Sequence, residues 1–210
     1  MTEEMEAREA HVLWLSVVQR LMGRAAHDVK DSLNGVAVNL EVIRSRAARE
    51  GAPAASVAPF AEAAGQQLER LTSLLEALLA VARSEREPVN VGVALRRVAT
   101  LCAASSSADD AKVVVDELPA DDAVTRLPGA VVRLALAAPL LDAVHGGANG
   151  ASPVRCTLRL VAREVIVSFA AEGRTLAMPA DVTRVVQEAG IRWTEGVQEQ
   201  GVLSLAFPRE

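Results

Sequence analysis

The sequence predicts an α+β chain in which an antiparallel helical hairpin precedes an α/β sandwich of mixed type. First, apolar residues recur at steps of three and four over about 45 residues, a length typical of bundle or coiled-coil helices. Second, another apolar helical pattern follows a short loop. Third, after Pro88 the pattern changes to short helices and β-branched runs. We therefore expect two domains, 1–86 and 87–210.

The first helix is predicted from Glu3 to Arg49. Its apolar residues follow one another at an average spacing close to the heptad value of about 3.5 residues, so they form a seam along one side. The residues of this seam are Leu15, Val18, Met22, Ala25, Val29, Ser32 or Leu33, Val36, Leu40 and Ile43. A seam of this length predicts packing against other helices.

Residues 51–58 form the predicted loop, with Ser56 as the N-cap of a second helix over Pro59–Ser84. The apolar residues of that helix are Phe60, Ala64, Leu68, Leu71, Leu75, Leu78 and Ala82. Two helices cannot bury such wide stripes alone, whereas two copies of the hairpin can do so in a dimeric four-helix bundle. We expect this homodimer. The alternative is that the carboxy-terminal domain covers the stripe within one chain.

A linker, Ser84–Asn90, leads into the second domain, because Pro88 ends the helical pattern. The expected elements that follow are a helix over Val91–Ala104, a strand over Lys112–Asp116, a helix over Leu127–Val144 containing Pro139, a hairpin of Val154–Val161 and Glu164–Ala170, a helix over Asp181–Ala189 with Asp181 as its N-cap, and a hairpin of Ile191–Val197 and Val202–Phe207. These short elements predict the α/β sandwich.

His27 stands away from the seam of the first helix. Since successive helical residues turn by about 100°, His27 points roughly 160–200° from the seam and faces solvent. Its neighbours three and four positions away include Arg24, Lys30 and Asp31. Cations beside an imidazole stabilise the charge of a phosphoryl group during transfer. The simpler interpretation is one polar residue on a solvated helix face.

Composition excludes several functions. A net charge of −5 and 2% aromatic residues argue against a nucleic-acid partner. Cys102 and Cys156 have no metal-like spacing, and we expect them to be buried thiols in a reducing compartment. The acidic start differs from a signal peptide, and no apolar run is long enough to cross a membrane. We therefore expect a cytoplasmic protein with no membrane partner.

The segment AAHDVKDSLNGVAVNLEVI resembles the H-box of two-component histidine kinases, and it is more similar still to histidine phosphotransferases of the ChpT type, which share the bundle and do not use ATP. The matching residues are His27, Asp28, Lys30 and Leu33. Ser32 replaces the usual proline. Asp31 stands where many kinases carry the Thr or Asn needed for phosphatase activity, which argues against that activity.

The order of elements in the second domain resembles the ATP-binding domain of histidine kinases, but its nucleotide motifs are lost. Asp142 aligns with the magnesium-binding Asn, and Ala171 lies near the position of the Asp that reads adenine. Only Gly173 of the first glycine box remains. Ala177–Asp181 is too short for an ATP lid. The resemblance thus implies a degenerate domain with no nucleotide cofactor of its own.

The resemblance implies a histidine phosphotransferase of a bacterial phosphorelay. Nε2 of His27 would accept a phosphoryl group from one receiver aspartate and pass it to another, with Mg²⁺ supplied by the receiver. Asp28 would hold Nδ1 and fix the tautomer, while Lys30 and Arg24 would stabilise charge or assist docking. The docking surface would consist of Asp31, Asn34, Ala37, Val38 and Glu41.

The expected partners are response-regulator receivers, a hybrid histidine kinase and a second copy of the chain. Two other functions stay open at this point. The first is a non-enzymatic pseudokinase or adaptor, which would bind a kinase or receiver without chemistry at His27. The second is a divergent histidine kinase that still binds ATP.

Overall fold

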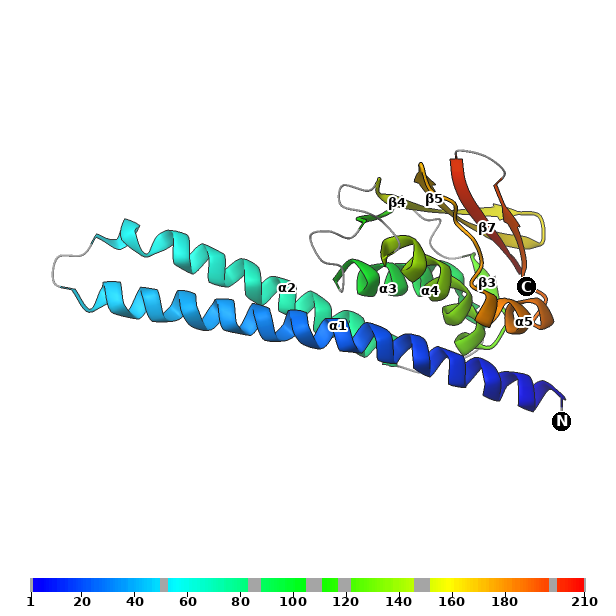
Figure 1. Cartoon of the computed structure of the whole chain (residues 1–210), viewed down its shortest axis with the longest axis horizontal. Helices are drawn as coiled ribbons and strands as arrows, with labels where there is room; N and C mark the ends of the chain where they lie inside the picture. Colours follow the sequence, from blue (N-terminus) through cyan, green and yellow to red (C-terminus); the bar gives the residue numbers. More distant parts are fainter. Residues whose placement is uncertain are drawn as a thin grey trace.

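One long helix organises the molecule. The computed structural model describes residues 2–49, 53–82, 88–104, 111–116, 122–145, 152–196 and 200–209. Helix α1 (Thr2–Ala47) runs almost the whole length of the molecule. Helix α2 (Ala58–Ala82) folds back along the carboxy-terminal half of α1. The α/β part lies against the amino-terminal half of α1 (Figure 1).

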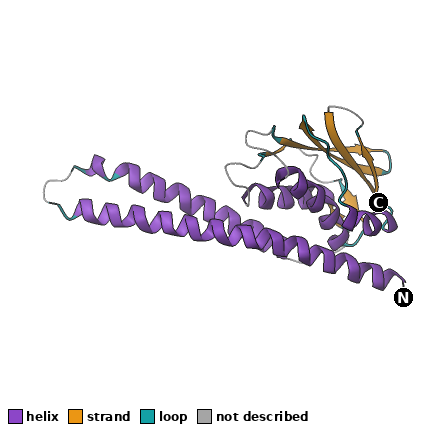
Figure 2. Cartoon of the chain, in the orientation of Figure 1, coloured by secondary structure: helices purple, strands orange, loops and turns teal. Residues whose placement is uncertain are grey.

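The α/β part has two layers above α1. Its helices form the layer next to α1, and its strands form the outer layer (Figure 2). The helices are α3 (Val91–Ala104), α4 (Gly129–His145) and α5 (Ala180–Glu188). The strands are β1 (Val89–Asn90), β2 (Val113–Val115), β3 (Val124–Thr125), β4 (Val154–Val161), β5 (Glu164–Glu172), β6 (Arg192–Glu195) and β7 (Gln200–Pro208).

The main sheet has the strand order β2-β4-β5-β7-β6, in which β2 is parallel to β4 and the other pairs are antiparallel. Side chains alternate between its two faces, as the strand period of two requires. Val167 and Phe169 of β5 are buried opposite Leu205 and Leu203 of β7. A separate short pair joins β1 to β3.

Helix α4 lies between α1 and the sheet, and its composition explains this position. Nearly every residue of α4 is buried, including Pro139 in the middle of the helix. A helix that is apolar on all sides belongs in the interior of a domain. The loss of one backbone donor at Pro139 is tolerated there without ending the helix.

The core continues from the α/β part into the first half of α1. The buried residues of α1 are Ala10, Trp14, Val17, Leu21 and Ala25, and they belong to the same cluster as α4 and the sheet. The guanidinium of Arg133 on α4 lies 5.3 Å from the centre of the Trp14 ring. The α/β part therefore covers one side of this half of α1 within the chain, whereas Leu15 and Met22 of the predicted seam stay exposed.

The predicted seam combined two different sides of α1. Trp14 and Leu21 are buried, whereas the residues that follow them, Leu15 and Met22, are 46% and 52% exposed. Because one residue turns a helix by about 100°, Leu15 and Met22 lie on a separate stripe. The exposed stripe of α1, which we call the apolar stripe, consists of Leu15, Met22, Leu33 and Leu40.

The predicted helices and hairpins are present, and their described ends lie within about two residues of those expected, as is usual for helix and strand boundaries. Two predicted caps are wrong. Ser56 lies in a 3₁₀ turn ahead of α2, and α5 begins after Pro179, whose carbonyl accepts the first helical hydrogen bonds in place of a cap by Asp181. The end of the expected linker forms β1, while residues 83–87 lie outside the described part.

Trp14 should be essential to the joint between α1 and the α/β part. We expect Trp14→Ala to lower the free energy of unfolding by about 3–5 kcal/mol, since a buried indole leaves a large cavity. Val12→Ala on the same helix is the control, because Val12 is 59% exposed and should change stability by less than about 0.5 kcal/mol. Urea unfolding followed by circular dichroism measures both; equal effects would contradict the described packing.

Candidate functional site

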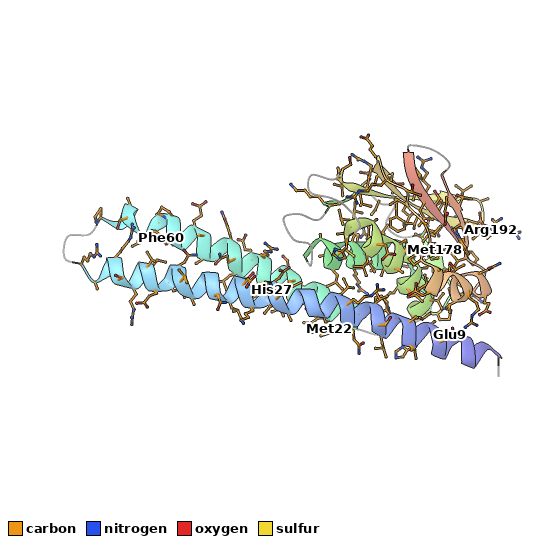
Figure 3. The ribbon with its side chains drawn as sticks, in the orientation of Figure 1. Glu9, Met22, His27, Phe60, Met178 and Arg192 are labelled. Atoms are coloured by element: carbon orange, nitrogen blue, oxygen red, sulfur yellow. The ribbon has the colours of Figure 1, made fainter. Side chains whose placement is uncertain are left out.

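His27 faces solvent, as the sequence predicted. Its side chain is 76% exposed, and it lies on α1 between the loop end of the hairpin and the α/β part (Figure 3). The apolar stripe lies roughly 120–140° away around the helix. An approaching protein can therefore contact the imidazole without displacing any part of this chain.

Asp31 holds the imidazole. Oδ2 of Asp31 lies 2.9 Å from Nδ1 of His27, one helical turn further along α1. A carboxylate only accepts hydrogen bonds, so this contact favours the tautomer that carries its proton on Nδ1. The lone pair of Nε2 is then directed toward solvent, which is the arrangement that a nucleophilic imidazole needs.

The contact expected from Asp28 is thus made by Asp31. Asp28 lies about 100° around the helix from His27, whereas Asp31 lies only about 40° away, and this difference decides which carboxylate reaches the ring. Asp28 faces α2 instead. Its side chain is only 23% exposed, and its Oδ2 lies 3.8 Å from Nη2 of Arg70 on α2.

The predicted docking residues share the exposed side of α1 with His27. Asn34, Val38 and Glu41 lie within roughly 40° of the imidazole direction, and Ala37 lies about 80° away. All four are exposed, and Val38 is exposed by 63%. Glu41 makes an ion pair of 2.8 Å with Arg44.

The two cations expected near His27 differ in what can be said of them. Lys30 is exposed and lies about 60° around α1 from His27. The backbone of Arg24 belongs to α1, but its side chain lies outside the described part. The sequence interpretation missed Arg70, because pairing it with Asp28 requires the relative register of the two helices.

Some of the residues that the resemblance aligned with a nucleotide site line a cavity of about 410 Å³ beside α4, whereas Ala171 lines a different cavity. Asp142 supplies an exposed carboxylate at this cavity, and the segment from Ala177 to Pro179 forms part of its wall. The guanidinium of Arg174 also lines it and donates a hydrogen bond to the carbonyl of Ala143. Gly173 adopts a positive φ of 70° in the turn before Arg174.

The two cysteines are buried, as expected. Burial raises the pKa of Cys156 to about 12, and it raises the pKa of Cys102 further. Thiols that stay protonated at neutral pH are poor nucleophiles and poor metal ligands. Within the described ranges, no group of three or more His, Cys, Asp or Glu side chains is arranged to hold a metal ion.

The described helices include none with the length and hydropathy that a membrane span requires.

Comparison with solved structures finds a phosphotransferase and histidine kinases that match most of the chain. A bacterial phosphotransferase is 18% identical with a TM-score of 0.44, and the match covers 91% of this chain and 96% of that one. The histidine kinase ThkA, solved with the response regulator TrrA, is 15% identical with a TM-score of 0.47, and the match covers 100% of this chain and 66% of the kinase.

The Acinetobacter baumannii histidine kinase AdeS is 14% identical with a TM-score of 0.42, and the match covers 88% of this chain and 98% of the kinase. No protein-family model and no curated protein matches the sequence. At these identities and TM-scores, the function has to be inferred from the side chains of this chain.

We expect Asp31, and not Asp28, to set the tautomer of His27. In Asp31→Asn the fraction of neutral imidazole with its proton on Nδ1 should fall, since the carboxylate acceptor is removed. The ¹⁵N chemical shifts of the ring nitrogens, recorded at a pH where the ring is neutral, measure this fraction. Asp28→Asn is the matched control, and a change in that variant alone would refute the assignment.

Proposed function

We propose that the protein is a histidine phosphotransferase that relays a phosphoryl group between receiver aspartates through His27. The observation that supports this most is the exposed imidazole whose Nδ1 lies 2.9 Å from Oδ2 of Asp31, which leaves Nε2 as the nitrogen outside that contact. A side chain that is 76% exposed on a regular helix suits reaction with a second protein better than reaction in a pocket. The H-box resemblance of the segment around His27 points to the same chemistry.

The transfer step requires no group beyond the two proteins. Nε2 of His27 attacks the phosphorus of a phosphorylated receiver aspartate, so an N–P bond forms while the P–O bond to the aspartate breaks, and the carboxylate leaves with the electron pair. The proton stays on Nδ1, where Asp31 stabilises the positive charge of the ring. A second receiver carboxylate then attacks the phosphorus, and the neutral imidazole leaves.

In this proposal the receiver brings the Mg²⁺, because its carboxylates are the ligands that a hard cation prefers. The chain supplies neither a nucleotide nor a metal. Its α/β part acts as a support that buries the first half of α1 and so fixes the direction of His27. Lys30 contributes positive charge beside the transferring group.

The docking surface and the dimer interface lie on different sides of the hairpin. Leu75 and Leu79 of α2 are 46% and 60% exposed, and each follows a residue that packs in the core, the buried Leu74 or the partly buried Leu78. The same offset holds for the apolar stripe of α1. Because the helices are antiparallel, residues rotated by the same angle and in the same direction from the buried side of each helix lie on one side of the hairpin. The exposed leucines of α2 and the apolar stripe of α1 therefore share that side. A second copy covers this apolar face in the proposed four-helix bundle, leaving His27 accessible.

The phosphotransfer proposal is tested without ATP. Receiver domains of the source organism are phosphorylated with acetyl phosphate, freed of the donor and mixed with the protein. We expect loss of the receiver label and its appearance on the wild-type chain, and neither in His27→Ala. His11→Ala, which removes another exposed histidine of α1, should transfer normally. If no receiver exchanges label with His27, the proposal is wrong, and an adaptor that keeps its cellular function in His27→Ala replaces it.

The assignment of the two faces is tested with two residues of α1. Val38 and Leu40 are 63% and 54% exposed, but they point about 160° apart. Leu40→Lys should reduce the mass in solution from twice 22.1 kDa toward 22.1 kDa, because it places a charge in the apolar face. Val38→Lys should remain dimeric and lose receiver binding. Sedimentation equilibrium and receiver titration measure both; a monomeric wild type would contradict the bundle.

A further inference from the structure

Arg70 of α2 lies beside the residue that follows His27 in the chain. Its Nη2 is 3.8 Å from Oδ2 of Asp28, which is too long for a hydrogen bond, and its side chain is 56% exposed. The Oδ2 atom of Asp28 is buried and has no hydrogen-bond partner among the described residues. The guanidinium is therefore held near α1 by charge attraction, without a fixed geometry.

Arg70 also lies on the same side of the hairpin as His27. On α2, Arg70 is rotated by about 40° from the buried Leu74, and the exposed Leu75 is rotated from Leu74 in the opposite direction. On α1, His27 lies about 120° from the buried Leu21, also in the sense opposite to the apolar stripe. In an antiparallel pair of helices, residues that are rotated in the same direction from the buried side of each helix lie on the same side of the pair. The contact with Asp28 then fixes the height of Arg70 along the hairpin.

A phosphorylated His27 would need a cation at this place. A phosphoryl group on Nε2 carries close to two negative charges at neutral pH, and the neighbouring carboxylates of Asp31 and Asp28 add two more. Like charges at this spacing disfavour one another. Arg70 carries a guanidinium, which binds phosphoryl oxygens through two parallel hydrogen bonds.

We propose that Arg70 is the cation of the second helix that binds the phosphoryl group on His27. It leaves the loose contact with Asp28 when His27 is phosphorylated, and it returns when the phosphoryl group departs. Asp28 is the positioning residue that keeps the guanidinium near the imidazole between transfers. This role rests on the proposed phosphotransfer at His27, but it can be tested without any receiver.

The test uses potassium phosphoramidate as the phosphoryl donor. Nε2 of His27 attacks its phosphorus, so the N–P bond to the ring forms while the P–N bond of the donor breaks. The protonated donor nitrogen leaves with the electron pair as neutral ammonia, and the proton of the ring stays on Nδ1. The ³¹P spectrum of the phosphorylated protein is then recorded across pH. His27→Ala identifies the signal, because it should remove the resonance.

The decisive variant is Arg70→Gln. We expect the midpoint of the pH titration of the ³¹P shift to rise by roughly half a pH unit, because a cation beside the phosphoryl group opposes protonation of the phosphoimidazole. The expected shift is small because solvent screens charges at an exposed site. The rate of phosphorylation should fall by about fivefold, which is a smaller loss than the removal of a hydrogen-bond donor causes in a buried active site. Arg70→Lys, which keeps the charge, should retain most of the wild-type midpoint.

Arg44→Gln is the matched control. It removes another exposed guanidinium of the hairpin that is paired with a carboxylate, and it lies roughly 25 Å along α1 from His27. Its midpoint and rate should equal those of the wild type. A midpoint in Arg70→Gln equal to that of the wild type would overturn the proposal, even if thermal unfolding showed a change in stability. Labelling by phosphoramidate without exchange with receivers would refute the phosphotransfer function and leave the role of Arg70 measurable.

Discussion

Burial along one side of α1 is the constraint on which the rest of the structure depends. Two different partners cover that side: helices of the α/β part pack on Trp14 and Leu21, and α2 packs on the half toward the hairpin loop. Because the same side is covered throughout, every other direction around α1 is fixed. The direction of His27 follows from packing that begins more than three turns away from it.

Two carboxylates near His27 have separate tasks because they leave the helix in different directions. Asp31 points with the imidazole and holds Nδ1, while Asp28 points toward α2 and attracts Arg70. A carboxylate directly after the histidine in sequence is a natural candidate for the contact, yet helical geometry gives it to the residue one turn later. Two carboxylates thus lie near the imidazole, and the guanidinium of Arg70 offsets one of their charges.

Periodicity and turn residues were sufficient to predict the order of the helices and of the strands of the main sheet, and the outward direction of His27, but not the short strands β1 and β3. They were not sufficient to separate the buried Leu21 from the exposed Met22, because adjacent leucine-like residues satisfy the same average spacing. The α/β part covers half of α1 through Trp14 and Arg133, which are far apart in sequence and carry no local signal of their contact. The pairing of Asp28 with Arg70 was missed for the same reason, and the short strand at Val89–Asn90 is set by its partner and not by its own residues.

The continuity of α1 across the junction between the α/β part and the hairpin has a consequence for how such a chain can vary in length. Inserting a single amino acid between Leu21 and His27 would rotate everything beyond it by about 100° relative to the α/β part, so the exposed direction of His27 would change by the same angle. Changes of about seven or about eleven residues, close to whole numbers of helical turns, nearly preserve the angular phase. The connection between the end of α1 and the start of α2 is under no such restriction, so natural length polymorphism should accumulate there and avoid the middle of α1.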